Sequence, residues 1–129
     1  MLRYRYNQQV TPIAPFVYID CQRPLAPNAH LTLPALLDTG ADISTLPPDT
    51  IHHLTLVPLD EIPIASYRGE AVLVATYLVH LQIGSWTIGA VEVIAGGEAY
   101  AILGRDVLNQ FLLVLDGPRA ILEIHKDSE

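Results

Sequence analysis

The feature that most constrains this chain is an aspartate placed directly after an apolar run. Residues 31–37 read Leu-Thr-Leu-Pro-Ala-Leu-Leu and predict a buried strand, and Asp38, Thr39 and Gly40 follow it. An ionised carboxylate at the end of a buried strand is costly unless it is hydrogen-bonded, paired or functional. Gly40 permits a turn that brings peptide N–H groups to the carboxylate, and the Thr39 hydroxyl can bond the loop or a neighbouring chain. An aspartate that only caps a turn is the alternative interpretation.

Length and composition limit what can surround this aspartate. The 129 residues predict one domain, residues 1–129, because the chain is too short for two lobes with separate cores. Residues 1–12 are polar and aromatic and are expected to form an arm that either pairs as an edge strand or stays loose. Half of the residues are apolar and only 16% are charged, so we expect part of the surface to be buried against a partner.

Charge and cysteine content exclude several partners. The net charge is −7, and the seven Lys and Arg residues form no basic stripe, so no nucleic-acid partner is expected. No apolar run follows the N-terminal charges and Cys21 is the single cysteine, which favours a cytoplasmic location. Residues 71–91 lack charged side chains, but their polar, glycine and β-branched residues predict strands and no membrane insertion.

Short apolar and β-branched runs separated by turn residues recur along the chain. The expected strands are residues 16–20, 31–37, 43–46, 62–67, 71–83, 86–94, 101–103, 111–115 and 120–124. Residues 21–28 are expected to be an irregular connection because they contain two prolines. Short helices are predicted at residues 47–54 and 105–110. The pattern indicates an all-β domain, small and closed on itself, with one or two short helices.

A second unusual element, Ile102-Leu103-Gly104-Arg105-Asp106, joins an apolar strand to a short helix. Together with Asp38-Thr39-Gly40-Ala41-Asp42, it resembles the retropepsin-like aspartic proteases, the family of the retroviral proteases and their cellular relatives. The resemblance covers residues 16–124 and implies a small closed β-barrel of the acid protease type. It also implies a flap hairpin at residues 62–77, with Tyr67, Arg68 and Gly69 at a substrate-binding tip.

The chain departs from the retroviral members in two places. The predicted flap lacks their glycine-rich tip, and residues 111–124 add a hairpin more like that of the cellular and pepsin-type relatives. The interface strands of the retroviral dimer therefore cannot be transferred to this chain.

The resemblance assigns roles to individual residues. Asp38, Thr39 and Gly40 correspond to the catalytic loop, and Gly104 to the glycine of the late structural element. Asp42 and Arg105 match two residues that are paired in retroviral relatives, so we predict a partly buried ion pair that ties the active-site loop to the short helix. The alternative is two exposed charges that do not meet.

Hydrolysis by this mechanism needs two carboxylates that share a proton. One acts as general base on a water and the other as general acid toward the carbonyl oxygen. The chain has one Asp-Thr-Gly, so the second carboxylate must be Asp38 of another copy, and a homodimer without any cofactor is expected. Two like charges held close share one proton at mildly acidic pH, where activity should be highest.

Two other functions compete with a protease. A non-catalytic peptide-binding or dimerisation module of the same fold would keep the pattern without the chemistry. A metal-dependent hydrolase would rest on His52, His53 and His80. Adjacent helical residues point in different directions and no His-x-x-x-His or cysteine cluster occurs, so no metal site is expected.

Overall fold

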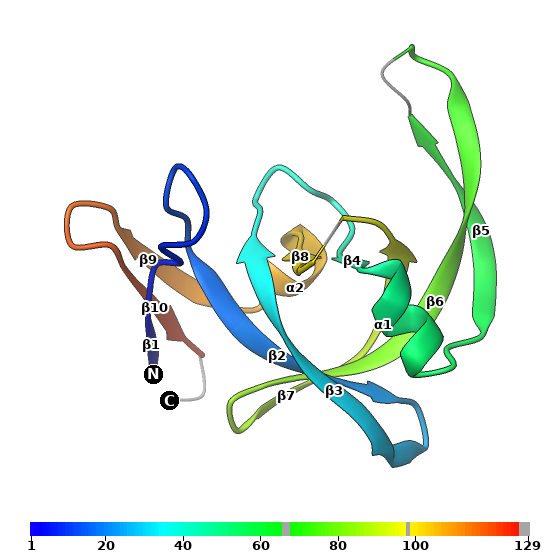
Figure 1. Cartoon of the computed structure of the whole chain (residues 1–129), viewed down its shortest axis with the longest axis horizontal. Coiled ribbons are helices and arrows are strands. Elements are labelled where there is room, and N and C mark those ends of the chain that lie inside the picture. The colour runs from blue at the N-terminus through cyan, green and yellow to red at the C-terminus, as the bar shows by residue number, and fades with distance from the viewer. Residues whose placement is uncertain (66–67, 98, 127–129) are drawn as a thin grey trace.

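The computed structural model describes residues 1–65, 68–97 and 99–126, and most of them lie in strands (Figure 1). The elements in chain order are β1 (Leu2–Arg5), β2 (Phe16–Arg23), β3 (Ala26–Leu37), β4 (Thr45–Leu46), α1 (Pro48–His53), β5 (Pro58–Ala65), β6 (Ala71–Ile83), β7 (Trp86–Ala95), β8 (Ala101–Leu103), α2 (Arg105–Leu108), β9 (Leu112–Asp116) and β10 (Ile121–His125). The predicted all-β class with two short helices is confirmed. No helix of these residues is long and apolar enough to cross a membrane.

Six strands form a closed ring around the hydrophobic core. The strand order is β2-β3-β8-β4-β7-β6, and a pairing between β2 and β6 closes it. Alternate side chains of each strand point inward, so that Ile19, Leu81 and Leu103 are fully buried. Cys21 is also buried there, and burial raises the pKa of its thiol to about 12. Within the ring, β3 and β8 pair in parallel register, with Ala35 opposite Ala101 and Leu37 opposite Leu103.

The β5–β6 hairpin extends beyond the ring (Figure 1). Its strands pair antiparallel from Pro58 opposite Tyr77 to Ala65 opposite Ala71, which confirms the hairpin predicted at residues 62–77. Gly69 has a positive φ of 76° in the connection, a conformation that suits glycine. Arg68 is described beside it, whereas Tyr67, the third residue of the predicted tip, lies outside the described residues.

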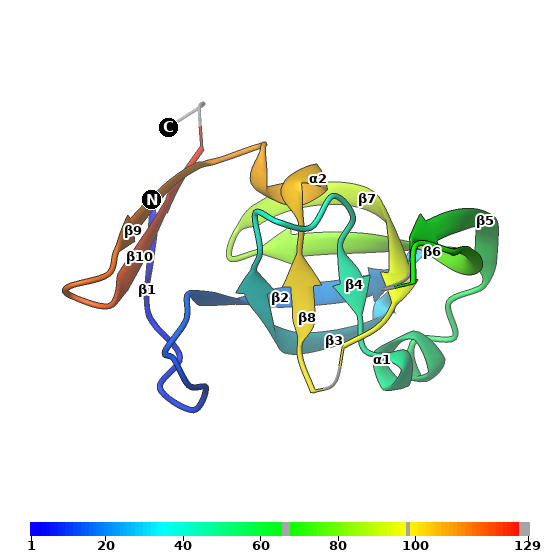
Figure 2. The same ribbon diagram turned by 90° about the horizontal axis from the view of Figure 1, so that it is seen from above.

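The terminal segments form a separate three-stranded sheet in the order β1-β10-β9, which flanks the ring in Figure 2. The N-terminal arm is thus partly an edge strand, with Leu2 opposite Ile124. Leu122 and Ile124 join the main core from the inner face of this sheet. On its exposed side, Arg3 Nη2 lies 2.7 Å from Glu123 Oε2, and this hydrogen bond holds the pKa of Glu123 below its ordinary value.

The prediction of an irregular connection at residues 21–28 is wrong. β2 continues to Arg23 and β3 begins at Ala26, so only Pro24 and Leu25 form the turn. Leu25 accepts a left-handed φ of 62°, and the register shifts between Gln22 and Arg23. Gln22 pairs with His30 while Arg23 pairs with Ala26, so Pro27 falls in the irregular part of the ladder, where no N–H donor is required.

Candidate active site

Asp38 directly follows β3, which lies between β2 and β8 in the ring. Its N–H donates to the Leu103 carbonyl at 3.0 Å and so extends the β3–β8 pairing by one residue. Ala35 and Leu103 point into the core. Side chains alternate along a strand, so Leu36 and Asp38 belong to the opposite, outward face. The carboxylate is therefore presented away from the core by a strand that is itself held on both sides.

The loop after Asp38 fixes its carboxylate through the backbone. The Gly40 N–H donates to Asp38 Oδ1 at 2.9 Å, and the Ala41 N–H donates to the Asp38 carbonyl at 3.2 Å. A Cβ at Gly40 would lie 3.1 Å from Asp38 Oδ1, a tight contact that the carboxylate would have to relieve by shifting a few tenths of an ångström. The predicted contact between a peptide N–H and the carboxylate is confirmed.

Residues from β8 and α2 hold this loop from behind. The Gly104 N–H donates to Ser44 Oγ at 3.0 Å, and Ser44 Oγ donates to Asp106 Oδ1 at 2.7 Å. The Ser44 N–H also donates to Asp106 Oδ2 at 3.0 Å. A Cβ at Gly104 would lie only 2.8 Å from the Ala41 carbonyl oxygen, so a side chain does not fit between the two segments.

The predicted ion pair between Asp42 and Arg105 is not formed. Arg105 Nη1 donates to the Thr39 carbonyl at 2.7 Å, and Asp42 is exposed. Arg105 still ties the loop to the helix, because its N–H also donates to the Ala41 carbonyl at 2.8 Å. A carbonyl partner avoids the cost of desolvating a second charge. The carboxylate that bridges the two segments is that of Asp106, which the sequence analysis did not assign.

A row of half-buried side chains crosses the outward face next to Asp38. The register places Leu36 opposite Ile102, Ile102 opposite Thr45, and Thr45 opposite Ile94. Cross-strand partners point to the same face of a sheet. We call Leu36, Ile102, Thr45 and Ile94 the floor; it is apolar except for one hydroxyl.

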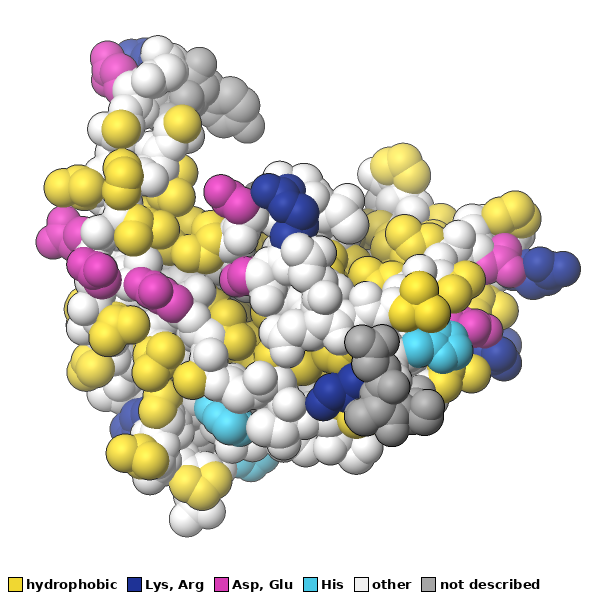
Figure 3. Space-filling view, turned by 180° about the vertical axis from the view of Figure 1, so that it is seen from behind, with side chains coloured by type: hydrophobic (Ala, Val, Ile, Leu, Met, Phe, Trp, Pro, Cys, Tyr) yellow, Lys and Arg dark blue, Asp and Glu magenta, His cyan; other side chains and the backbone are white. Residues whose placement is uncertain are grey.

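The hairpin continues this face. Ile94 is opposite Thr76, and alternation along β6 puts Val74 and Val72 on the same side as Thr76. Val72 is 52% exposed, and hydrophobic side chains run along the projecting hairpin in Figure 3. The floor and this side of the hairpin are therefore two apolar surfaces on one face of the sheet.

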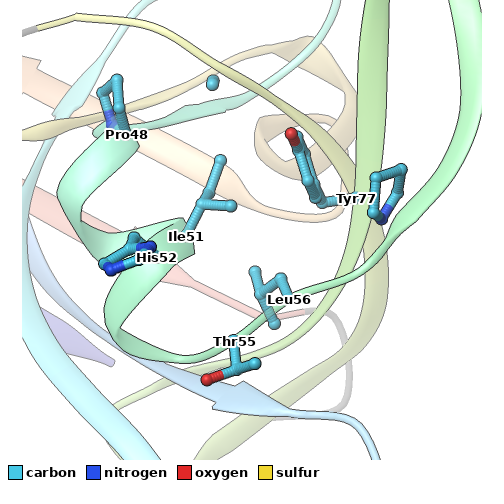
Figure 4. Close-up of a pocket in the computed structure, with 8 residues that line it drawn as sticks. Pro48, Ile51, His52, Thr55, Leu56 and Tyr77 are labelled. Atoms are coloured by element: carbon cyan, nitrogen blue, oxygen red, sulfur yellow. The ribbon is translucent and has the colours of Figure 1, made fainter.

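A pocket of about 480 Å³ lies between α1 and the base of the hairpin. Figure 4 shows Ile51 and His52 of α1, together with Leu56 and Tyr77, around it. Neither Asp38 nor the floor residues line this pocket. It is placed to affect how the hairpin joins the ring and does not contain the candidate catalytic group.

The histidines of the metal-hydrolase alternative are not brought together into a metal site. His52 and His53 are exposed on α1, and His80 lies on β6. Within residues 1–65, 68–97 and 99–126, no group of three His, Cys, Asp or Glu side chains is arranged to hold a metal ion.

Comparison with known protein families gives a match that covers most of this architecture. The model of the gag-polyprotein putative aspartyl protease family matches residues 26–110, from β3 through the segment after α2. This chain belongs to the retropepsin-like aspartic protease family. The resemblance inferred from the two sequence elements is confirmed.

Solved structures of retropepsins share the fold at low sequence identity. A retropepsin-like aspartic protease from Rickettsia conorii is 16% identical, with 95% of this chain and 88% of that chain covered and a TM-score of 0.61. The EIAV protease complexed with the inhibitor HBY-793 is 24% identical, with 82% and 92% covered and a TM-score of 0.54.

A third structure is much longer than this chain. The foamy viral protease-reverse transcriptase in complex with RNA/DNA hybrid is 17% identical with a TM-score of 0.52; the match covers 73% of this chain and 12% of that one. At these identities the likeness establishes the fold alone. No curated protein sequence matches this retropepsin.

Proposed function

We propose that this retropepsin is an aspartic endopeptidase that acts as a homodimer and hydrolyses peptide bonds with a water activated by two Asp38 carboxylates, one from each subunit. The observation that carries the proposal is the presentation of Asp38. Its carboxylate lies on the outward face at the end of β3 and is held by the Gly40 N–H at 2.9 Å. The sequence contains a single Asp-Thr-Gly, so the second carboxylate comes from a second copy.

Each Asp38 takes one of two roles in the proposed reaction. The ionised carboxylate accepts a proton from the attacking water, and the protonated one donates a proton to the carbonyl oxygen of the peptide. The Gly40 N–H keeps Oδ1 in place, which orients the carboxylate before substrate arrives. Thr39 is exposed in the single chain, and its hydroxyl is free to bond across the subunit boundary.

Exposed apolar side chains support the presence of a partner. Leu112, Val114 and Leu115 of β9 are each exposed on the terminal sheet, Leu112 to 62%. β9 is also an edge strand, so its backbone hydrogen-bonding groups are available on one side. Covering these residues with a second copy would remove apolar surface from water.

The substrate would be an extended peptide that lies between the floor and the hairpin. Extended peptides bind through strand-like backbone hydrogen bonds, and neighbouring pockets select their side chains. Arg68 and Gly69 would contact the substrate from the hairpin tip. We further propose a cytoplasmic location with neither nucleic-acid nor membrane partners, on the acidic charge of the chain and its single buried cysteine.

A peptide-library digest tests the proposal. Wild type and Asp38→Asn are incubated with the library at mildly acidic pH, with Asp49→Asn, an exposed carboxylate on α1, as the matched control. Wild type and Asp49→Asn should cut alike, and Asp38→Asn should lose at least about a hundredfold in rate. Cutting should weaken as rising pH removes the shared proton.

Equal cutting by wild type and Asp38→Asn would contradict the proposed chemistry. A wild-type dimer that binds peptides without cutting them would support the alternative, a non-catalytic peptide-binding or dimerisation module of the same fold.

A further inference from the structure

One polar atom near the candidate active site has no partner. Thr45 Oγ1 is the single buried side-chain oxygen or nitrogen of the described part of the chain without a hydrogen bond. Two neighbouring buried hydroxyls are both bonded: Ser44 Oγ to Asp106 at 2.7 Å, and Thr76 Oγ1 to Glu92 at 2.5 Å. A buried hydroxyl without a partner is unfavourable, so the hydroxyl of Thr45 needs an explanation.

Thr45 lies in the floor, where the substrate of the proposed protease would bind. Thr45 lies on β4 between Ile102 of β8 and Ile94 of β7, so it interrupts the apolar floor with a hydroxyl. Ile102 in turn is opposite Leu36, two residues before Asp38. Cβ and Cγ2 of Thr45 are the atoms nearest to a Cβ built at Gly96, at 3.8 Å, so the methyl group of Thr45 and not its hydroxyl faces this glycine.

The ring itself does not require a hydroxyl here. Valine has the same branched shape and suits a strand equally well, without a polar group to satisfy. Thr45 is only partly buried, and rotation about χ1 can carry its hydroxyl to the place that its methyl group now occupies. A side chain that enters over the floor can therefore reach the hydroxyl.

We propose that Thr45 is a specificity-determining residue, and that its hydroxyl selects an uncharged hydrogen-bonding side chain, Asn, Gln, Ser or Thr, at one substrate position beside the cleaved bond. The inference rests on the proposed protease function. The apolar floor around Thr45 disfavours a charged side chain, which would lose its hydration there. An apolar substrate side chain would leave the hydroxyl unpaired in the complex.

The test compares wild type, Thr45→Val and Thr45→Ser on peptide pairs that differ only as Thr against Val, or Asn against Leu, at each position flanking the cleaved bond. Wild type should prefer the polar peptide at one position. Thr45→Val should lower that preference in kcat/KM by about tenfold, whereas Thr45→Ser should keep it. An unchanged preference in Thr45→Val, or an equal loss in Thr45→Ser, would overturn the proposal.

Binding and unfolding measurements keep this test separate from catalysis. The same peptide pairs are titrated against Asp38→Asn and against Asp38→Asn combined with Thr45→Val; the polar preference in affinity should disappear in the second protein. Thermal unfolding of Thr45→Val should match or exceed that of wild type, because an unpaired hydroxyl is removed. Marked destabilisation would show that Oγ1 has an internal partner and would overturn the proposal, whether or not the protein cuts peptides.

Discussion

The loop that carries Asp38 and the β5–β6 hairpin contribute to the same face of the sheet, but they are held in opposite ways. The loop is bonded to β8 through the Asp38 N–H, and to α2 through Arg105 and the pair of Ser44 with Asp106. The outer part of the hairpin pairs only with itself, and Val72 and Leu73 are 52% and 65% exposed. The difference indicates that Asp38 is held more rigidly than the outer hairpin, since segments with few buried contacts open most easily; in the proposed enzyme this would be a fixed catalytic group beside a movable cover.

The largest contrast is expected between two glycines. Gly104→Ala places a Cβ 2.8 Å from the Ala41 carbonyl oxygen, so backbone must shift, and we expect a loss of about 1–3 kcal/mol in unfolding free energy together with most of the activity. Gly69→Ala meets no atom within 4 Å and has only its positive φ to overcome, about 1 kcal/mol. Urea unfolding of both variants measures the difference. Equal losses would show that the loop is no more rigidly held than the hairpin tip.

A second contrast is between Asp106, whose carboxylate supports the loop, and Asp42, which the family pattern suggested for that role. Ser44→Ala removes the acceptor of the Gly104 N–H and one donor to Asp106, so about 1–3 kcal/mol of stability should be lost. Asp42→Asn changes an exposed side chain and should stay within about 0.5 kcal/mol of wild type. Denaturant midpoints of the two variants give the result; a larger loss in Asp42→Asn would restore the ion-pair hypothesis.

The third contrast lies within the hairpin. Val72 shares the side of Thr76 and the floor, whereas Leu73 points the other way, and both are exposed. Neither Val72→Ser nor Leu73→Ser should change stability by more than about 0.5 kcal/mol. Val72→Ser should lower kcat/KM by about tenfold because substrate loses an apolar contact, and Leu73→Ser should leave it unchanged. The prediction fails if the two substitutions lower kcat/KM equally.

The smallest effect is expected on the terminal sheet, where the half-buried Glu123 accepts hydrogen bonds from two neighbouring side chains, whereas Asp106 supports the loop after Asp38. The hydrogen bond from Arg3, with a second from His125, holds the pKa of Glu123 below its ordinary value of 4.5. The contribution of Glu123 to stability is therefore present above pH 4.5 and is lost as pH falls through the lower folded-state pKa. Unfolding of Glu123→Gln should be slightly easier than that of wild type at neutral pH. The difference in unfolding free energy between the two proteins should shrink on acidification. A difference that grew would contradict the lowered pKa of Glu123.

The features that the sequence predicted are those encoded in short, local patterns. Asp38-Thr39-Gly40 and Ile102-Leu103-Gly104 identified β3 and β8, which are neighbouring strands of the ring, and alternating runs with turn residues located the β5–β6 hairpin. The approach of a peptide N–H to the Asp38 carboxylate could be predicted because it depends on adjacent residues.

The features that were missed depend on contacts between distant segments. Ser44 and Asp106 are separated by 62 residues, and only the fold shows that Asp106, rather than Asp42, joins the loop to α2. The β2–β3 hairpin was missed because two prolines indicated an irregular segment, whereas a register shift accommodates Pro27. The unpaired hydroxyl of Thr45 is visible only once every neighbour is placed. The one signal that the sequence offered was the place of Asp106 in the first turn of a predicted helix, where an acidic side chain is favourable.

Mixed dimers test the central claim most directly. Wild type and Asp38→Asn chains are combined in equal amounts under conditions that allow subunits to exchange, and the rate of peptide cutting is compared with that of the same total amount of wild type. If each active site needs Asp38 from both subunits, random pairing leaves about a quarter of the wild-type activity. A residual activity of about one half would show that each chain cuts on its own and would contradict the shared site.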